Sequence, residues 1–216
     1  MDLSDVKRMM GAHERDVRRR LFQAVALTAI MLTALGLYLA VLYWRGQHAT
    51  IETRLAWDAW VPFWPRWVWV YLFPYLLAPL IAASMSGETF RWYIRRGLPV
   101  VLVSLGIFAL LPTRTVRPPV EASALGDGLT AWQYRRMVAI DAGGGNAAPS
   151  LHVSLTCLLA CALLRDYPRG WPIILAGVGL VWLATLFTWQ HHLLDVATGA
   201  LLALAFALPF WKRFGL

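Results

Sequence analysis

Six apolar stretches, separated by charged or proline-containing segments, constrain this chain more than any other feature of its sequence. About 20 consecutive apolar residues form a helix that crosses the ~30 Å hydrocarbon core of a bilayer. The composition agrees, because 59% of the residues are hydrophobic and only 15% are charged, whereas about a quarter are charged in soluble domains. We therefore predict an all-α fold, a six-helix transmembrane bundle. The predicted membrane helices cover residues 21–44, 67–85, 97–111, 149–164, 171–189 and 191–211.

The segment before the first apolar stretch, residues 1–20, is polar and basic. It predicts a short amphipathic helix that lies on the cytoplasmic membrane surface. The stretch 21–44 is too long for the apolar part of a signal peptide, and no small-residue cleavage site follows it, so we expect it to be retained. The predicted organisation is thus an N-terminal segment, 1–20, and one six-span membrane domain, 21–216, with candidate catalytic motifs within 112–200.

The lengths of two apolar stretches indicate where a pocket would lie. The third, 97–111, would cover roughly 22 Å as a helix, which is less than the hydrocarbon core, and the fourth, 149–164, is also short. We therefore expect a pocket below the lipid headgroups that opens sideways to lipid. Between them, residues 113–148 are rich in Pro, Gly and mixed charge, which predicts an irregular extracytoplasmic linker with a short helix near 129–140.

The net charge of +8 does not indicate nucleic-acid binding, because the basic residues lie between apolar stretches, where they set membrane orientation. With the N-terminus in the cytoplasm, thirteen of the 20 Lys and Arg residues lie on the inner side. This asymmetry predicts a plasma (inner) membrane protein with both termini cytoplasmic, in contact with the anionic lipid surface. It also brings four residues to the extracytoplasmic side: Arg117, His152, His191 and Asp195.

Ionisable residues at the edge of an apolar stretch predict a functional site, because such residues are costly in a membrane. Asp195 follows His191 by four residues and His192 by three, so both offsets fall on one face of a predicted helix. The carboxylate can accept a hydrogen bond from one imidazole, which leaves the other ring nitrogen as a nucleophile or base. A structural pair packed between helices would show the same spacing.

Another histidine, His152, follows Pro149 closely and is predicted to lie in the first turn of a helix. Free backbone N–H groups there attract anions such as phosphate. The preceding run from Gly143 to Asn146 lets the backbone approach a ligand, although a flexible linker has the same composition. It is not a nucleotide P-loop, since no Gly-Lys-Ser/Thr follows.

Two arginines open the predicted linker, Arg114 and Arg117. A guanidinium can bind phosphate oxygens by two parallel hydrogen bonds, but it can equally anchor the linker at the lipid headgroups. Arg135 and Arg136 carry the same alternatives, and we interpret them as interface anchors.

These motifs resemble those of the type 2 phosphatidic acid phosphatase superfamily, a six-helix group of membrane lipid phosphatases and phosphotransferases. The first family motif ends in Arg-Pro, as in Arg117-Pro118. The second is Pro-Ser-x-His, matched by Pro149-Ser150-Leu151-His152. The third ends in His-x-x-x-Asp, matched by His191 and Asp195. The resemblance covers about residues 100–210, and the order, spacing and topology agree.

The sequence departs from the phosphatase branch of that superfamily at three positions. Where that branch has a Lys, this chain has Leu110, and where it has Ser-Arg, this chain has Ala184-Thr185. The Pro-Ser-Leu-His form and the paired His191-His192 look more like the branch of sphingolipid synthases and inositolphosphotransferases. The departures leave the substrate and the acceptor open.

The resemblance implies phosphoryl chemistry without a metal or a cofactor. His191 would attack phosphorus and form a phosphohistidine, with His192 as the alternative nucleophile, while Asp195 orients the ring. His152 would protonate the leaving alkoxide and then activate water or an alcohol. The implied phosphate-binding residues are Arg117, Arg114 and Ser150.

The leading hypothesis is hydrolysis of a lipid phosphate monoester or pyrophosphate at the outer face. One alternative is the transfer of a phosphoryl-headgroup to a lipid or sugar alcohol. Two others are a buried metal site, formed by the histidines and Asp195, and a non-catalytic lipid-binding protein. The sequence predicts no oligomeric state.

Overall fold

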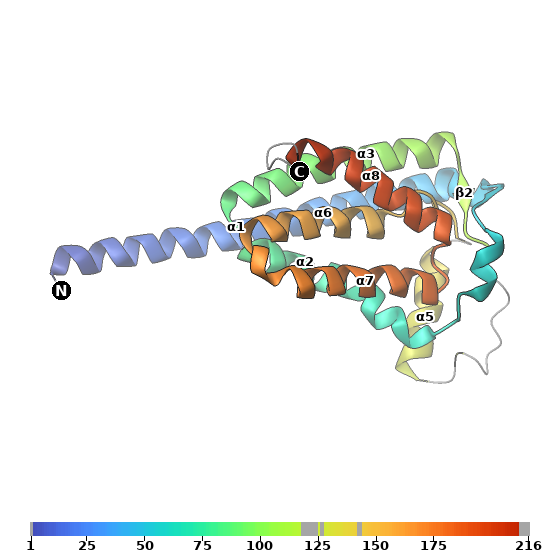
Figure 1. Cartoon of the computed structure of the whole chain (residues 1–216), viewed down its shortest axis with the longest axis horizontal. Coiled ribbons are helices and arrows are strands. Elements are labelled where there is room, and N and C mark those ends of the chain that lie inside the picture. Colours follow the sequence, from blue (N-terminus) through green and yellow to red (C-terminus); the bar gives the residue numbers. More distant parts are fainter. Residues whose placement is uncertain (1, 118–124, 126–127, 142–143, 212–216) are drawn as a thin grey trace.

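The computed structural model describes residues 2–117, 125, 128–141 and 144–211. Figure 1 shows an all-α protein in which the helices other than α5 run along roughly the same direction. This confirms the all-α part of the predicted fold. The helices are α1 (Leu3–Trp44), α2 (Val68–Ser84), α3 (Gly87–Leu110), α5 (Leu129–Ile140), α6 (Leu151–Asp166), α7 (Trp171–Phe187) and α8 (Leu193–Trp211).

Within the described residues, four stretches of helix are long and apolar enough to cross a membrane. These stretches are Met9–Trp44, Pro65–Ser84, Gly87–Leu110 and Pro168–Phe187. The apolar part of α8, Leu193–Ala207, is shorter, and α6 has 16 residues. Large apolar side chains such as Leu76, Leu102 and Ile173 are exposed on the outside of the bundle. A surface of this kind suits contact with lipid.

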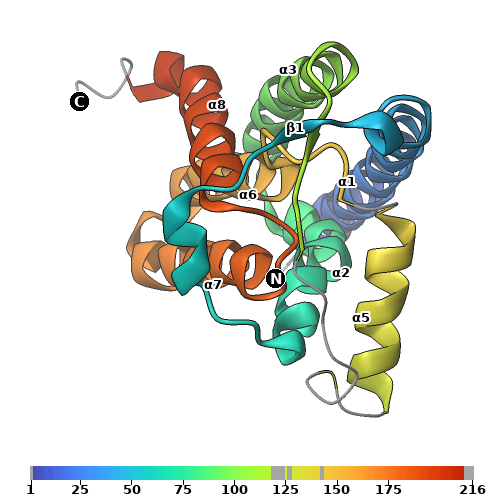
Figure 2. The ribbon, with the colours of Figure 1, turned by 90° about the vertical axis from the view of Figure 1, so that its right-hand side faces the viewer.

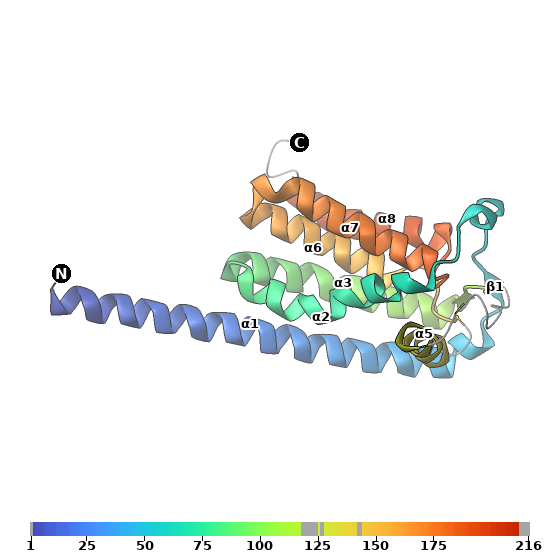
Figure 3. The ribbon, with the colours of Figure 1, turned by 90° about the horizontal axis from the view of Figure 1, so that it is seen from below.

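Helix α6 lies in the middle of the bundle, between α3 on one side and α7 and α8 on the other (Figure 3). Leu158 and Ala162 of α6 are fully buried, and so is Val100 of α3. Across from them, α8 contributes the small buried residues Ala203 and Ala207. Small residues let helices approach closely, which is how helices associate in membranes. The bundle core therefore fixes α6 between its neighbouring helices.

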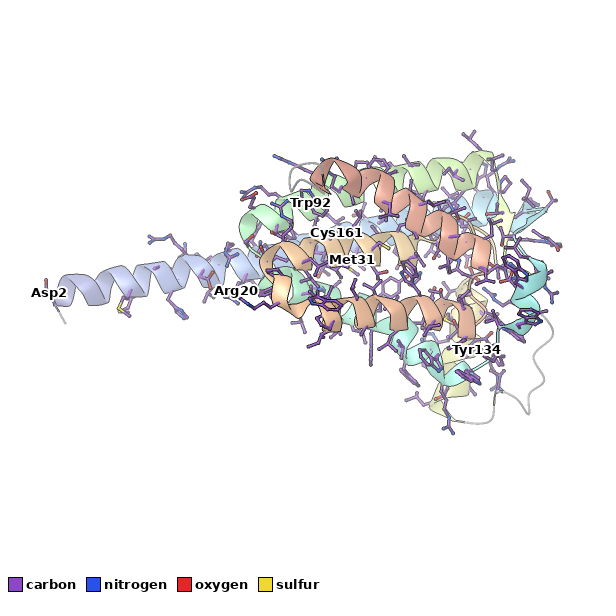
Figure 4. All side chains as sticks on the ribbon, viewed as in Figure 1. Asp2, Arg20, Met31, Trp92, Tyr134 and Cys161 are labelled. Carbon is purple, nitrogen blue, oxygen red and sulfur yellow. The ribbon has the colours of Figure 1, made fainter. Side chains whose placement is uncertain are left out.

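The predicted separation between an N-terminal surface helix and a first membrane helix is wrong. The structure has one continuous helix of 42 residues, α1. No proline interrupts it, and ion pairs between residues four apart support its polar part: Arg18 with Glu14 at 2.5 Å and Arg20 with Asp16 at 2.6 Å. Figure 4 shows Arg20 near the edge of the bundle, with the helix projecting beyond it as far as Asp2.

The predicted start of the third membrane helix is also wrong. Helix α3 begins at Gly87 and has 24 residues, because the Ser86 hydroxyl accepts a hydrogen bond from the Thr89 N–H at 3.1 Å and caps the helix there. The charged segment that contains Arg91 therefore belongs to the helix. Of the two helices predicted to be short, only α6 is short, covering roughly 24 Å. One helix, not two, therefore indicates a pocket below the lipid headgroups.

The other predicted helices, including the short one at 129–140, begin and end within about two residues of those observed.

Irregular structure gathers at one end of the bundle, as Figure 2 shows from that end. Two short strands, β1 (Ile51–Glu52) and β2 (Thr113–Arg114), pair in parallel there, with Ile51 opposite Thr113. The pair joins the segment after α1 to the segment after α3. Helices α6 and α8 begin at this end, whereas α8 ends and α1 begins toward the opposite end (Figure 1). The bundle thus brings two sequence-distant helix starts together.

Candidate active site

The turn before α8 carries the two adjacent histidines. The prediction placed both on the helix, but α8 begins at Leu193, so His191 and His192 precede it. The Asp195 carboxylate reaches back and accepts a hydrogen bond from the His192 backbone N–H at 2.8 Å. A carboxylate in the first helical turn often caps its own helix in this way. Asp195 therefore fixes the histidine turn through the backbone.

The predicted proximity of His191 and Asp195 is present, although a turn and not a helix face produces it. The His191 Nδ1 atom lies 3.4 Å from Asp195 Oδ2, without the alignment of a hydrogen bond. Asp195 is fully buried, and its Oδ2 also accepts a hydrogen bond from the Thr115 hydroxyl at 3.3 Å. With Nδ1 beside the carboxylate, Nε2 is the nitrogen of His191 left for chemistry.

His192 has polar partners at both ring nitrogens. Its Nδ1 lies 3.0 Å from the Thr53 hydroxyl, and its Nε2 lies 3.3 Å from the Val116 carbonyl. The residue is only 7% exposed. A nucleophilic nitrogen needs a free lone pair, so this arrangement favours His191 over His192 for attack.

His152 is the second residue of α6 and lies near His191. The centres of the two imidazole rings are 6.1 Å apart, a separation that one phosphoryl group can bridge. The Tyr71 ring packs against His152 at 4.1 Å between centres, and the Tyr75 ring meets it edge-on at 5.1 Å. Tyrosines from α2 thus hold His152 beside the turn that carries His191.

Several buried polar atoms at this place have no hydrogen-bond partner among the described residues. In a folded protein such atoms call for an explanation, such as a catalytic role or a ligand. They come from the start of α6 and from the segment of residues 190–195, the two parts of the chain that carry the histidines. The atoms are His152 Nε2, Gln190 Nε2, His191 Nδ1 and Asp195 Oδ1.

Ser150, expected to bind phosphate, lies inside the protein. It is fully buried, and its hydroxyl accepts a long hydrogen bond of 3.5 Å from the Val153 N–H, which caps α6. Its own N–H donates to the Asp195 carbonyl oxygen at 3.0 Å. Ser150 therefore links the start of α6 directly to the start of α8.

Arg117 lies next to the histidine turn and is 10% exposed at its side chain. Its Nε donates to the Trp189 carbonyl at 2.8 Å, and one terminal nitrogen donates to Gln190 Oε1 at 3.2 Å. The same terminal nitrogen forms an ion pair with Asp141. Burial lowers the pKa of the Arg117 guanidinium, because a charge away from water is costly. An anion beside it, whether a carboxylate or a phosphoryl group, offsets that cost.

Arg114 shares an open pocket of about 320 Å³ with Arg117; the described residues that line the pocket also include Thr115, Val116 and Val138. The Arg114 guanidinium is partly exposed and pairs with Glu52 at 2.6 Å. The structure therefore places the two predicted arginines in one pocket, with Arg117 buried and Arg114 more accessible.

The described glycines of the run Gly143 to Asn146 lie against the backbone of the protein. Gly143 lies outside the described residues. Gly144 has a φ of +89°, and a Cβ there would lie 2.4 Å from the Thr115 carbonyl oxygen. A Cβ on Gly145 would lie 2.7 Å from the Gly46 carbonyl oxygen. The close approach predicted for these glycines is thus to the backbone of the protein itself.

The described residues do not offer the set of ligands that the metal-site alternative needs. Among the residues that the structure describes, no three His, Cys, Asp or Glu side chains lie close enough together to hold a metal ion. Zinc sites in proteins usually need at least three.

Four residues that contact the site were not identified from the sequence. Thr53 lies in the loop after α1, and Asp141 directly follows α5. Gln190 and Tyr71 lie in apolar parts of the sequence, and such parts predict residues that pack in the core of the bundle. Only the position of Asp141, a carboxylate between a predicted helix and a glycine run, hints at a role.

Fold and site together define a helical protein with membrane-length helices and a buried cluster of two histidines, a carboxylate and an arginine at one end. The family model described as the PAP2 superfamily, the type 2 phosphatidic acid phosphatases, matches residues 46–208. The chain therefore belongs to the PAP2 superfamily. No curated protein and no solved structure matches it. Membership indicates phosphatase or phosphotransferase chemistry. The matched range contains the whole cluster and begins just after α1.

Proposed function

We propose that this protein is a membrane-embedded lipid phosphate phosphatase that works through a phosphohistidine. The observation that carries the proposal is the approach of His152 and His191 to 6.1 Å between ring centres, with Arg117 beside the same turn. These residues come from three segments that are distant in sequence. Their convergence around unpartnered polar atoms suits a phosphoryl group.

In the first step, His191 Nε2 attacks the phosphorus atom and the bond from phosphorus to the leaving oxygen breaks. The imidazole gains positive charge as it becomes a phosphohistidine, and the buried Asp195 carboxylate beside Nδ1 stabilises that charge. His152, on the other side of the phosphoryl group, gives a proton to the departing alkoxide. The lipid alcohol then leaves.

In the second step, His152 takes a proton from water, and the water oxygen attacks the phosphohistidine. Inorganic phosphate forms and His191 is regenerated. Throughout, Arg117 neutralises the phosphoryl oxygens, since a fixed positive charge in a water-poor site stabilises developing negative charge. The partly exposed Arg114, in the same pocket, binds the outer part of the headgroup.

We place the protein in the plasma (inner) membrane as a six-span bundle, with residues 21–216 as one membrane domain. The four helices of membrane length are compatible with this placement. Helix α6 and the shorter apolar part of α8, Leu193–Ala207, complete it because both pack within the same bundle. The excess of basic residues at the opposite end from the histidines supports cytoplasmic termini and an extracytoplasmic site.

Transfer to an alcohol acceptor is the second candidate function. Where the phosphatase branch has Ser-Arg, this chain has Ala184 and Thr185. Both of these residues are fully buried. The Thr185 carbonyl instead accepts the His191 backbone N–H at 3.1 Å. The chain thus lacks a cation that the phosphatase branch places near the phosphoryl group, which favours membership of the phosphotransferase branch. In that case His152 would activate a lipid or sugar alcohol.

The test is a product screen with purified protein in detergent, using lipid phosphates and scoring free phosphate against new lipid by mass. We expect wild-type turnover and no turnover for His191→Ala or His152→Ala, because nucleophile and proton donor are lost. Free phosphate supports hydrolysis, and a new phospholipid supports transfer. If His192→Ala is inactive while His191→Ala is active, the assigned nucleophile is wrong.

The metal-site reading is tested in the same assay. We expect a chelator to leave turnover unchanged. Activity that vanishes with chelator and returns with zinc would contradict the proposed mechanism. If wild-type protein turns over none of the lipid phosphates, the enzyme proposal itself fails and a lipid-binding role is favoured.

A further inference from the structure

We propose that the segment between α1 and α2, residues 45–67 (the first loop), positions the nucleophile, with Asp58 and Thr53 as its positioning residues. The inference rests on the proposed function, in which His191 attacks phosphorus. The first loop carries none of the catalytic side chains. It nevertheless contacts the histidine turn at several points, and these contacts decide where the His191 ring lies.

Asp58 caps the helix that follows the histidines. It lies in the 3₁₀ helix Ala56–Trp60, where its Oδ2 accepts a hydrogen bond from the Leu55 N–H at 2.6 Å. Its Oδ1 accepts one from the Leu193 N–H at 2.8 Å. Leu193 is the first residue of α8, and its N–H has no acceptor within that helix. A carboxylate at a helix N-terminus is also favoured by the helix dipole. Asp58 thus ties α8 to the first loop.

Thr53 holds the second histidine of the turn. Its hydroxyl lies 3.0 Å from His192 Nδ1, and both residues are buried. Thr53 is itself fixed, because its backbone N–H donates to the Arg114 carbonyl at 3.3 Å, beside the pairing of β1 with β2. His192 is therefore a fixed neighbour of His191, held from the first loop.

The rest of the first loop contacts the other side of the turn. The Trp64 N–H donates to the carbonyl of Phe187, the last residue of α7, at 2.8 Å. The Trp189 indole N–H donates to the Val61 carbonyl at 3.3 Å. The first loop thus spans the gap from the end of α7 to the start of α8 and holds both sides of the segment that contains His191.

His191 depends on this support because its own ring has weak restraints. Its Nδ1 lies near Asp195 without hydrogen-bond alignment, and its backbone N–H donates to the Thr185 carbonyl at 3.1 Å. The ring is therefore oriented by the backbone of the turn. Displacement of a reacting group by about 1 Å can lower a rate by roughly 100-fold, so contacts that fix the turn control kcat.

The experiment compares Asp58→Ala, Asp58→Asn and Thr53→Val with a matched cap deletion, Ser86→Ala, which removes the cap of α3 at the opposite end of the bundle. Purified variants are assayed for kcat and KM on a lipid phosphate, and their melting temperatures are measured. We expect Asp58→Ala and Thr53→Val to lower kcat by about 10- to 100-fold with little change in KM. Asp58→Asn keeps an acceptor for Leu193 and retains most of kcat.

Ser86→Ala should lower the melting temperature about as much as Asp58→Ala, because each removes one helix cap, yet leave kcat unchanged. If Asp58→Ala and Ser86→Ala lose kcat equally, the Asp58 cap affects turnover only through the stability of the protein, and the proposal is wrong. Unchanged kcat in Asp58→Ala would also overturn the proposal.

Hydrogen exchange of the peptide covering residues 188–198 tests the positioning without any turnover. We expect faster exchange in Asp58→Ala and not in Ser86→Ala. If the wild type proves inactive on all lipid phosphates, the proposed function fails, and faster exchange in Asp58→Ala alone still supports the contact between loop and turn. Unchanged exchange in Asp58→Ala overturns it, whatever the activity.

Discussion

The ion pair of Arg117 with Asp141 places a carboxylate beside the guanidinium that we propose binds the phosphoryl group. Both side chains are largely buried, so each charge compensates the other in a place poor in water. Removing one partner of a buried pair costs several kcal/mol, because the remaining charge is left uncompensated. Asp141 therefore stabilises the charge of Arg117, and in the proposed mechanism a phosphoryl group must compete with this carboxylate.

We predict that Asp141→Asn lowers stability and strengthens phosphate binding. The uncompensated Arg117 lowers the melting temperature, and saturating inorganic phosphate restores it by supplying the missing anion. The inhibition constant of inorganic phosphate should fall about tenfold, equivalent to ~1.4 kcal/mol. Thermal melts with and without phosphate, together with inhibition assays, measure both effects.

Glu52→Gln is the matched control for Asp141→Asn. It removes the carboxylate partner of Arg114, but that pair is partly exposed, and such pairs contribute about 0–1 kcal/mol. Little change is expected in stability or phosphate inhibition. Weaker phosphate binding in Asp141→Asn would show that Asp141 orients Arg117 for the substrate and does not compete with it.

At the scale of elements, the contact of α6 with α8 determines the distance between His152 and His191, the two histidines of the proposed mechanism. The Ser154 hydroxyl of α6 donates to the Gly199 carbonyl of α8 at 2.9 Å. A Cβ on Gly199 would lie 2.6 Å from the Ser150 carbonyl oxygen. The helices can approach this closely only because residue 199 has no side chain. Their starts carry His152 and the turn with His191.

We therefore predict that Gly199→Ala pushes α8 away from α6. The overlap with backbone that cannot move aside should destabilise the protein by about 1–3 kcal/mol, and the separated histidines should lower kcat. Gly179→Ala is the control, since nothing lies within 4 Å of a Cβ at that position in α7. Replacing a helical glycine there should leave activity unchanged and stabilise by up to ~1 kcal/mol. Unfolding and turnover assays compare Gly199→Ala with Gly179→Ala. Equal stability of the two variants would contradict the close packing of α8 on α6.

The sequence predicted most of the helices because apolar runs mark the parts of a chain that lie in lipid. It predicted helix ends poorly where charged residues continue a helix beyond lipid. Helix α3 begins at Gly87 because Ser86 caps it, and the polar start of α1 is supported by local ion pairs. Hydropathy contains neither signal, so both helices were predicted too short.

The candidate site was predicted in part for a similar reason. Motif residues such as His152 and His191 precede apolar runs, and one orientation rule brought them to the same side. The residues that contact these histidines could not be predicted in this way. Thr53, for example, contacts His192 although the two lie 139 positions apart in the sequence. Only the folded chain shows such contacts. The helical spacing also misplaced His191, since the cap formed by Asp195 starts α8 two residues later.

For the whole molecule, the two ends of the bundle differ in chemistry. One end has the histidine turn, the two strands and α5, with Tyr134 labelled there in Figure 4. The other end joins helices through polar contacts, as where Asp166 accepts the Ser86 N–H at 2.7 Å and Arg19 donates to the Met85 carbonyl at 2.7 Å. The proposed orientation puts this second end in the cytoplasm.

Cysteine labelling in cells tests that orientation. In a background of Cys157→Ala and Cys161→Ala, single cysteines replace Arg54, at the histidine end, or Arg169, in the turn between α6 and α7; both residues are exposed. A membrane-impermeant maleimide should label Arg54→Cys in intact cells and Arg169→Cys only after permeabilisation, because the bilayer lies between them. The reversed pattern would place the histidines in the cytoplasm, where the substrate would have to be a lipid of the inner leaflet. Labelling of both in intact cells would contradict a bundle that separates its two ends across the membrane.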